Sequence, residues 1–396
     1  MGEKNRIFAI SGMPASGKST TIKNMIKELE ESGVKSENIH KFSTGSEFRK
    51  YIEAISELAE LNTDEISEEG KEYLRKLYTL SGMGRDELIK IIANVKKNNN
   101  KFNIAAANKE PEFAKVREAI DTIIDRSVVD LGKEINSGKT SDEIWIFDSR
   151  LAFSNIPSSF SVRTTIRDDI AGKRAYNDST RGEEDKYDNI DEAIEATKKR
   201  KEGERSRYLE RYGVDLEDER NYNLIIDTSF AKSEEVAKTI LKCEELERQG
   251  KPYDKLWASP KQMLPLQTER LTLGMGSEET IDSIVQKIKQ EGYRPNEGID
   301  VVEVDGEKYI IEGHHRNFGN ALAGNTLIPY HVLNKEGIMS DEEARRRSEC
   351  CNTIYLASHA WMLDSDGKFF NYEETYPKIW KKFKEKEKKT KEEKER

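Results

Sequence analysis

The segment GMPASGKST at residues 12–20 constrains this chain more than any other part of its sequence. It has the spacing G-x-x-x-x-G-K-S, and the apolar run before it, residues 6–11, is typical of a buried strand. The glycines allow a tight turn whose backbone N–H groups point at phosphate oxygens, and the lysine reaches the terminal phosphates of a nucleotide. The serine hydroxyl that follows is a ligand for Mg²⁺. We therefore expect this loop to bind ATP and Mg²⁺ through Gly12, Ser16, Gly17, Lys18, Ser19 and Thr20.

A second apolar strand is predicted at residues 144–148, and it ends in an aspartate. Ligands of open α/β sheets lie beyond the carboxyl ends of the strands. We therefore expect Asp148 to join Ser19 at the metal. The alternative is an aspartate that only caps a turn.

Two further segments could bind the molecule that receives the phosphate. Residues 41–52 place Ser43, Thr44 and Arg49 at a strand-to-helix junction, where a hydroxyl, backbone donors and a guanidinium can meet an anion. Arg150 lies just beyond the strand that ends at Asp148.

A charged helix is predicted near residues 195–216. Its Arg200, Glu204 and Arg207 have the spacing i, i+4, i+7, so they fall within a sector of roughly 60° on one helix face. Two arginines suit a phosphate, and a carboxylate suits an exocyclic amine. The alternative is a set of salt bridges in solvent.

Composition limits the remaining classes of protein. The chain has 396 residues, which predicts two or three domains, and 36% of them are charged. We expect no membrane association, because no run approaches the roughly 18–20 apolar residues of a spanning helix. The three cysteines offer no spaced pair for a disulfide or zinc, which predicts a cytoplasmic location, the host cytoplasm if the protein is viral. A net charge of -9 disfavours general nucleic-acid binding, and the oligomeric state is left open.

The order of these motifs resembles that of cytidylate kinases, most closely the short archaeal form, over about residues 5–245. The motifs are the phosphate loop, STGSEFR, DSRLA, RKEGERSRY and YNLIIDTS. The resemblance implies that Arg150, Arg200, Glu204 and Arg207 hold the phosphate and base of CMP, with Ser43, Thr44 and Arg49 in the same pocket. It also implies a lid at about 171–189, whose Arg174 and Arg181 act with Lys18 in catalysis. Two features depart from the family: Glu204 stands where the bacterial enzymes carry Asp, and the mostly helical insertion at about 51–140 is longer than expected.

The composition of the chain changes after residue 250. Residues 251–267 contain three prolines and are interpreted as a linker. A smaller α+β domain is predicted at 253–336, with helices at about 278–291 and from Arg316, and strands near 301–303, 309–311 and 329–333. A helical extension is expected at 337–380, and the Lys/Glu-rich residues 381–396 are typical of a solvated helix or a disordered tail.

The segment YIIEGHHRNFGNALAGNTLIPYHVL, residues 309–333, resembles the turn of the ParB/sulfiredoxin fold, whose members bind phosphate at G-x-H-R or G-E-R-R. The resemblance implies a phosphate site made of Glu312, Gly313, His315 and Arg316. The alternative is a structural turn with solvated histidines. Adjacent histidines point apart, so we expect no two-histidine metal site, and His314 replaces the reactive cysteine of sulfiredoxin.

Together these features predict an α/β P-loop kinase of residues 1–250, with a central parallel sheet and a helical insertion, joined to the smaller domain and the charged tail. The leading hypothesis is transfer of the ATP γ-phosphate to a pyrimidine nucleotide, CMP or dCMP. The second is phosphorylation of a hydroxymethyl pyrimidine in DNA, in a viral hypermodification pathway, with the ParB-like domain contacting DNA. A nucleotide-gated binding protein and phosphorylation of free serine by the second domain are the remaining alternatives.

Overall fold

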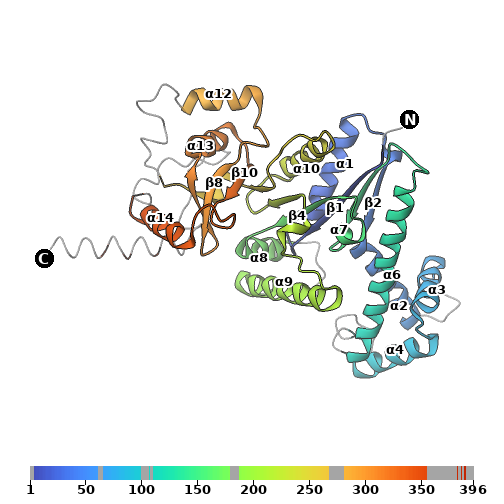
Figure 1. Ribbon diagram of the computed structural model, residues 1–396. Coiled ribbons are helices and arrows are strands. Elements are labelled where there is room, and N and C mark those ends of the chain that lie inside the picture. Colours follow the sequence, from blue (N-terminus) through green and yellow to red (C-terminus); the bar gives the residue numbers. More distant parts are fainter. Residues whose placement is uncertain are drawn as a thin grey trace. The chain divides into compact units, whose positions relative to one another are not determined.

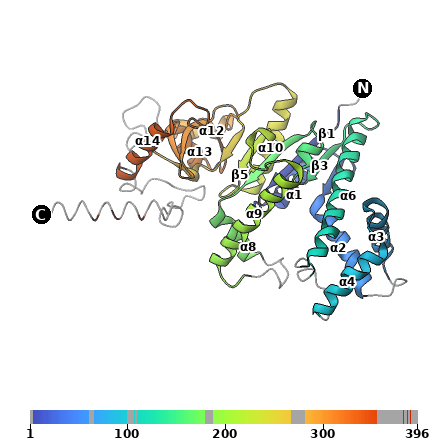
Figure 2. The same cartoon turned by 60° about the horizontal axis from the view of Figure 1, so that its bottom comes forward.

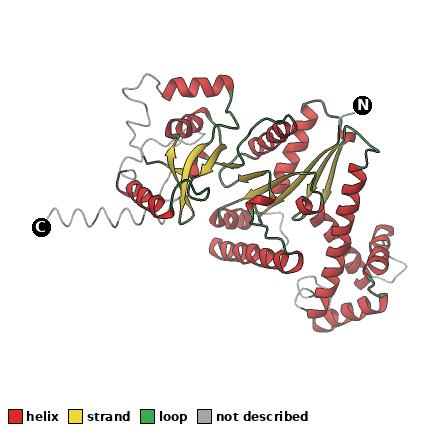
Figure 3. Cartoon of the chain, viewed as in Figure 1, coloured by secondary structure: helices red, strands yellow, loops and turns green. Residues whose placement is uncertain are grey.

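A computed structural model describes residues 4–60, 66–99, 107, 110–178, 187–266 and 281–354, and single residues 381, 385 and 388. The chain divides into two compact units. Unit 1 comprises residues 1–22, 29–163 and 172–222, and unit 2 comprises residues 23–28, 164–171 and 223–396. Both contain helices and strands (Figure 3), so the predicted mixed α/β class is confirmed. The expected division of the chain near residues 250–253 stays a prediction.

Unit 1 contains strands at both of the apolar runs predicted in it, residues 6–11 and 144–148. Its strands are β1 (Arg6–Gly12), β2 (Ile39–Ser43), β3 (Ile144–Asp148) and β4 (Phe160–Thr165), whose last two residues belong to unit 2. Strand β3 lies between β1 and β2 and is parallel to both. Residues Ile7 to Gly12 of β1 are all buried, as expected for a parallel strand covered on both faces. The parallel arrangement brings the carboxyl ends of β1, β2 and β3 to one edge.

Most described residues between 51 and 140 lie in helices of unit 1, and their role as an insertion into a kinase stays a prediction. The helices of this unit are α2 (Thr44–Glu60), α3 (Glu68–Ser81), α4 (Arg85–Asn99), α6 (Pro111–Asn136), the short α7 (Ala152–Asn155) and α9 (Ile190–Tyr212), with the first residues of α1 (Lys18–Glu31) and the last of α8 (Asp168–Asn177). Helix α4 ends at Asn99, and residues 100–106 lie outside the described residues.

Helix α6 connects two hydrophobic cores within unit 1. Its first half packs with α2, α3 and α4 through Phe113, Val116 and Ile120. Its second half contributes Val128 and Ile135 to the core beneath β1 and β3. Figure 1 and the turned view of Figure 2 both show α6 running from the strands into this group of small helices. The middle of α6 therefore lies beside the edge where the strands end.

Unit 2 contains shorter strands with mixed pairing. Its elements are β5 (Leu224–Asp227), α10 (Ser233–Arg248), β6 (Leu256–Ala258), β7 (Met263–Leu264), α12 (Ile281–Glu291), β8 (Ile299–Val304), β9 (Glu307–Glu312), α13 (His314–Ala323), β10 (Ile328–Val332) and α14 (Asp341–Ile354). The strand order is β5-β6-β10-β8-β9-β7. The β8–β9 and β6–β10 pairs are antiparallel, and the β5–β6, β8–β10 and β7–β9 pairs are parallel.

Two predictions for this part of the chain are wrong. Residues 251–267 are not merely a linker, because Trp257 and Met263 are buried in β6 and β7. The prolines at 252, 260 and 265 lie outside these paired residues, so they do not prevent strand formation. Helix α13 begins at His314, two residues before the expected start, because Gly313 takes the cap position with a φ of 97°.

The expected helical extension is described as far as α14, and residues 355–380 lie outside the described residues, as does the charged tail apart from residues 381, 385 and 388. Among the described helices, none is long and apolar enough to cross a membrane.

Candidate functional site

The phosphate loop, β2 and β3 meet at the carboxyl edge of the strands. In the sheet register, Asp148 pairs with Ile10 on one side and with Ser43 on the other. The Ser43 Oγ donates to Asp148 Oδ2 at 3.4 Å, and the Thr44 Oγ1 donates to the Asp148 carbonyl at 3.3 Å. Asp148 is therefore fixed between the loop and the β2–α2 junction.

The loop itself has the backbone of an anion-binding turn. Ala15 and Gly17 have positive φ angles of 58° and 73°, a region where an alanine is strained. The Ser16 N–H donates to the Met13 carbonyl at 3.2 Å, which closes the turn. Helix α1 begins at Lys18, and the first N–H groups of a helix have no partner within it. These groups are ready to bind phosphate oxygens.

Lys18 forms an ion pair with Asp148. Burial lowers the pKa of Lys18 below its usual value, and the negative charge of Asp148 opposes this effect. Ser19 lines the same cavity as this pair. The predicted nucleotide residue and the predicted metal carboxylate are thus in direct contact.

Arg174 of α8 reaches the phosphate loop. Its Nη1 donates to the Ala15 carbonyl at 3.4 Å and lies 3.6 Å from the position that a Cβ of Gly17 would take. A guanidinium at this place is close to where loop-bound phosphates would lie. The other expected lid arginine, Arg181, lies outside the described residues.

Glu204 is bound by two arginines. Arg150 Nη2 lies 2.6 Å from Glu204 Oε2, and Arg200 Nε lies 3.1 Å from Glu204 Oε1. Both carboxylate oxygens therefore have a cationic partner. The Nη1 of Arg150 is buried and has no hydrogen-bond partner among the described residues. Glu204 holds Arg150 in place and leaves it a donor for an anion.

One cavity of about 710 Å³ brings these groups together. The predicted residues that line it are Lys18, Ser19, Ser43, Thr44, Arg49, Asp148, Arg150, Arg200, Glu204 and Arg207. Every residue expected to bind the acceptor therefore faces the same space as the phosphate loop lysine. The roles assigned to them individually stay predictions.

The cavity has further walls that the sequence analysis missed. Helix α6 supplies Arg117, Asp121 and Asp125, and α9 supplies Tyr208 and Tyr212. The spacing of four places these α6 residues on one face of a helix, but spacing alone does not distinguish a face that lines a cavity from one in solvent. The Asp125 carboxylate accepts a hydrogen bond from the Tyr212 hydroxyl at 2.6 Å, which connects α6 to α9 across this wall.

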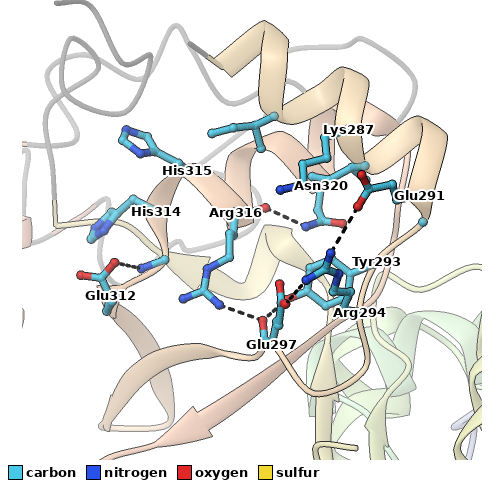
Figure 4. Close-up of a pocket in the computed structure, with 14 residues that line it drawn as sticks. Lys287, Glu291, Tyr293, Arg294, Glu297, Glu312, His314, His315, Arg316 and Asn320 are labelled. Atoms are coloured by element: carbon cyan, nitrogen blue, oxygen red, sulfur yellow. Dashed lines mark hydrogen bonds and ion pairs between the residues drawn. The ribbon is translucent and has the colours of Figure 1, made fainter. Parts of the chain in front are cut away.

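The predicted second site lies in unit 2, in a separate cavity of about 410 Å³ between α12 and α13 (Figure 4). Glu312, Gly313, His315 and Arg316 all line it. The Arg316 Nη1 donates to the carbonyls of Glu297 and Gly298 at 2.9 and 3.0 Å, as Figure 4 shows for Glu297. The Arg316 guanidinium therefore stabilises the loop before β8, and its role toward phosphate stays a prediction.

His314 is a buried, structural side chain in this region. Its Nε2 accepts a hydrogen bond from the Leu266 N–H at 2.9 Å. Burial lowers its pKa to about 4, with a smaller contribution from the charge of His315, so the ring is neutral near pH 7. Among the described residues, no group of three or more His, Cys, Asp and Glu is placed to hold a metal ion.

Comparisons with known proteins give short matches. The sequence matches no family model. It is 30% identical over 137 residues to an S-adenosylmethionine-dependent nucleotide dehydratase of Lacinutrix mariniflava, covering 34% of this chain and 25% of that protein. It is 42% identical over 52 residues to a cytidylate kinase of Thermoplasma volcanium, covering 13% of this chain and 27% of that protein. The chain thus spans about a quarter of the length of the curated relatives it matches.

Two solved structures match a larger share of the chain, at lower sequence identity. The shikimate kinase of Bacteroides thetaiotaomicron has a TM-score of 0.32 and 10% identity, covering 61% of this chain and 98% of its own. The protein TT1252 of Thermus thermophilus has a TM-score of 0.34 and 14% identity, covering 62% and 98%.

Proposed function

We propose that this protein is an ATP-dependent phosphotransferase of the nucleoside monophosphate kinase type, which acts on a pyrimidine nucleotide such as CMP or dCMP. The observation that carries the proposal is the shared cavity of Lys18, on the phosphate loop, and Arg150, beyond the neighbouring strand. A phosphate donor at the loop and an anionic acceptor at Arg150 would face each other in it. The 52-residue similarity to a cytidylate kinase supports this reading.

The reaction needs no covalent enzyme intermediate. An oxygen of the acceptor phosphate attacks the γ-phosphorus of ATP, the bond from that phosphorus to the bridging oxygen of the β-phosphate breaks, and ADP leaves. Phosphoryl transfer of this kind depends on positioning and on neutralising charge. Lys18 would exchange Asp148 for the phosphates, and Arg174 above the loop would add a second positive charge.

The residues at the strand edge suit Mg²⁺. Ser19, Asp148 and Ser43 offer hydroxyl and carboxylate oxygens, the hard ligands that Mg²⁺ prefers. Ser19 and Asp148 would hold the ion, and Ser43 would orient the carboxylate through its hydrogen bond. When bound, Mg²⁺ would neutralise charge on the nucleotide phosphates.

Arg150 is the residue placed to bind the acceptor phosphate. Its Nη2 is held by Glu204, while its buried Nη1 has no partner among the described residues. Arg200 and Arg207 line the same cavity and add positive charge. An acceptor phosphate would complete the hydrogen bonding of the Arg150 guanidinium, since a buried donor without a partner is costly.

Phosphate transfer from labelled MgATP to a panel of acceptors tests the proposal. The panel holds CMP, dCMP, UMP, dTMP, AMP, free serine, and DNA with and without hydroxymethyl pyrimidines. Lys18→Ala is the inactive variant, and Lys23→Ala, an exposed lysine on the same helix, is its matched control. We expect label on CMP or dCMP, lost in Lys18→Ala and retained in Lys23→Ala. MgATP binding with no transfer to any acceptor would contradict the proposal and favour a nucleotide-gated binding protein.

A second candidate is phosphorylation of a modified pyrimidine within DNA. The observation that favours it is a second cavity of about 780 Å³ that shares Arg117, Asp121 and Arg207 with the first, so a larger acceptor would find further space beside the site. On this reading unit 2 would contact the DNA. Label on hydroxymethylated DNA, with none on free nucleotides, would support this candidate over the first.

A further inference from the structure

The acceptor cavity has two distinguishable ends. A small recess lined by Gly12 and Met13 of the phosphate loop shares Arg150 and Glu204 with the cavity. The second large cavity instead shares Asp121 with it. Arg150 therefore lies toward the phosphate loop, and Asp121 lies toward the far end, on α6.

This order separates the parts of an acceptor. The oxygen that receives the phosphate must lie at the loop end, close to Lys18. The rest of the acceptor then extends toward α6. In a nucleotide phosphorylated on its own phosphate, the base would occupy the far end.

A carboxylate free to read a base must have acceptor capacity to spare. Glu204 has less of it than Asp125, because each Glu204 oxygen already faces an arginine, at 2.6 and 3.1 Å. A carboxylate has about four lone-pair sites. Asp125 uses one for the Tyr212 hydroxyl. Asp121 faces Arg211 Nη1 at 3.5 Å, longer than an ordinary charge-assisted hydrogen bond.

Arg211 makes hydrogen bonds to other residues of α6. Its Nη2 donates to the Glu118 carbonyl at 3.0 Å and to Thr122 Oγ1 at 2.9 Å. These bonds fix its guanidinium on the α6 backbone. Burial raises the pKa of both Asp121 and Asp125. The charges of Arg207 and Arg211 oppose this effect at both groups, and the Tyr212 hydrogen bond opposes it at Asp125. Both carboxyl groups are thus partly buried in the wall of the cavity, beside positive charges.

We infer that Asp121 and Asp125 select an acceptor whose distal group is a hydrogen-bond donor, and that they distinguish the amino group of a cytosine-type base from the carbonyl of a uracil-type base. This inference rests on the proposed function, and it places the selection on α6, in the insertion, and not on Glu204. A carboxylate accepts from an amine and repels a carbonyl oxygen. An asparagine of the same size can donate to a carbonyl, so Asp→Asn removes the discrimination and preserves the shape.

Titration calorimetry of the full chain with CMP and UMP tests the inference without requiring turnover. We expect the wild type to bind CMP at least about tenfold more tightly than UMP. Asp121→Asn and Asp125→Asn should each weaken CMP binding and bring the ratio of the two affinities below about threefold. Asp130→Asn, on the same helix but exposed and outside the cavity, is the matched control and should keep the wild-type ratio.

The outcomes separate this inference from the proposed function. A wild type that binds CMP and UMP within twofold of each other would overturn the inference, as would full discrimination in both Asp121→Asn and Asp125→Asn. MgATP affinity, measured in parallel, should be unchanged in each variant and shows that the chain is folded. If the wild type discriminates but transfers no phosphate, the inference is upheld and the proposed function fails.

Discussion

Lys18 of the phosphate loop and Asp148 at the end of β3 form a largely buried ion pair at the edge where the parallel strands end. Two groups with separate expected roles, one toward phosphate and one toward metal, thus neutralise each other's charge. Binding of MgATP would replace this contact with one between Lys18 and a phosphate and one between Asp148 and Mg²⁺. The pair therefore connects occupancy of the site to the position of Asp148.

Replacing Asp148 tests its role at the metal. Asp148→Asn keeps the hydrogen bond geometry toward Ser43 and Thr44 but removes the negative charge. We expect kcat to fall by on the order of 10²-fold and the Mg²⁺ concentration for half-maximal transfer to rise. A Mg²⁺ titration of transfer activity measures both. Asp142→Asn, exposed in the loop before β3, should behave as wild type, and an unchanged Mg²⁺ requirement in Asp148→Asn would refute the assignment.

Glu204 is expected to act through the arginines that it holds. Glu204→Gln removes the anion between Arg150 and Arg200, so both guanidinium groups lose their fixed positions. We expect KM for the acceptor to rise about tenfold or more, an effect of roughly 1.4 kcal/mol, with the affinity for MgATP unchanged. Steady-state kinetics with each substrate varied in turn measures the two effects. Glu202→Gln, on the exposed side of the same helix, is the control; equal effects in both variants would argue against a special role for Glu204.

Gly313 and Gly324 form a matched pair for testing the turn before α13. Both have positive φ, 97° and 92°. A Cβ at Gly313 would lie 2.7 Å from Ile299 Cγ2, whereas a Cβ at Gly324 would meet nothing within 4 Å. Gly324→Ala should cost about 1–2 kcal/mol of unfolding free energy from the backbone alone, and Gly313→Ala about 1–3 kcal/mol more from the clash. Urea unfolding measures the difference, and equal losses would show that Ile299 yields without cost.

His314 predicts a pH dependence of stability. Its pKa is lowered to about 4 in the folded chain, chiefly by burial, from an ordinary 6.5, so the unfolded chain binds more protons between these values. The stability from a neutral His314 is therefore complete above about pH 6.5 and declines as the pH falls toward 4, by about 2 kcal/mol at pH 5. His314→Gln keeps an acceptor for the Leu266 N–H and should remove this part of the pH dependence. Urea unfolding at pH 7 and pH 5 measures it, and identical pH dependence in both proteins would rule out His314 as the cause.

The sequence predicted the parts of the site that follow from local pattern. Strand β3 has the predicted limits because its apolar run is short and bounded by polar residues. Parallel pairing then brings Asp148 to Ser43 and to the loop, as strand ends imply. Arg200, Glu204 and Arg207 line one cavity because their spacing places them on one helix face.

Other parts could not be predicted because they depend on packing between distant segments. Asp121 and Asp125 look like solvated helix residues in the sequence, and only the placement of α6 beside the strand edge directs them into the cavity. The three prolines of residues 251–267 led to the prediction of a linker in place of the short strands β6 and β7. These strands are stabilised by pairing with strands far away in the sequence. The hydrogen bonds from Arg316 to two carbonyls likewise could not be predicted, because those carbonyls belong to Glu297 and Gly298, in a loop outside the turn motif.

The most direct test of the central claim is the simultaneous measurement of ADP and CDP in one reaction with MgATP and CMP. Coupled transfer predicts that the two products form in a one-to-one ratio, and that both fall to background in Lys18→Ala but not in Lys23→Ala. ADP formed without CDP, or CDP formation that survives the loss of Lys18, would contradict a phosphotransferase built on this loop.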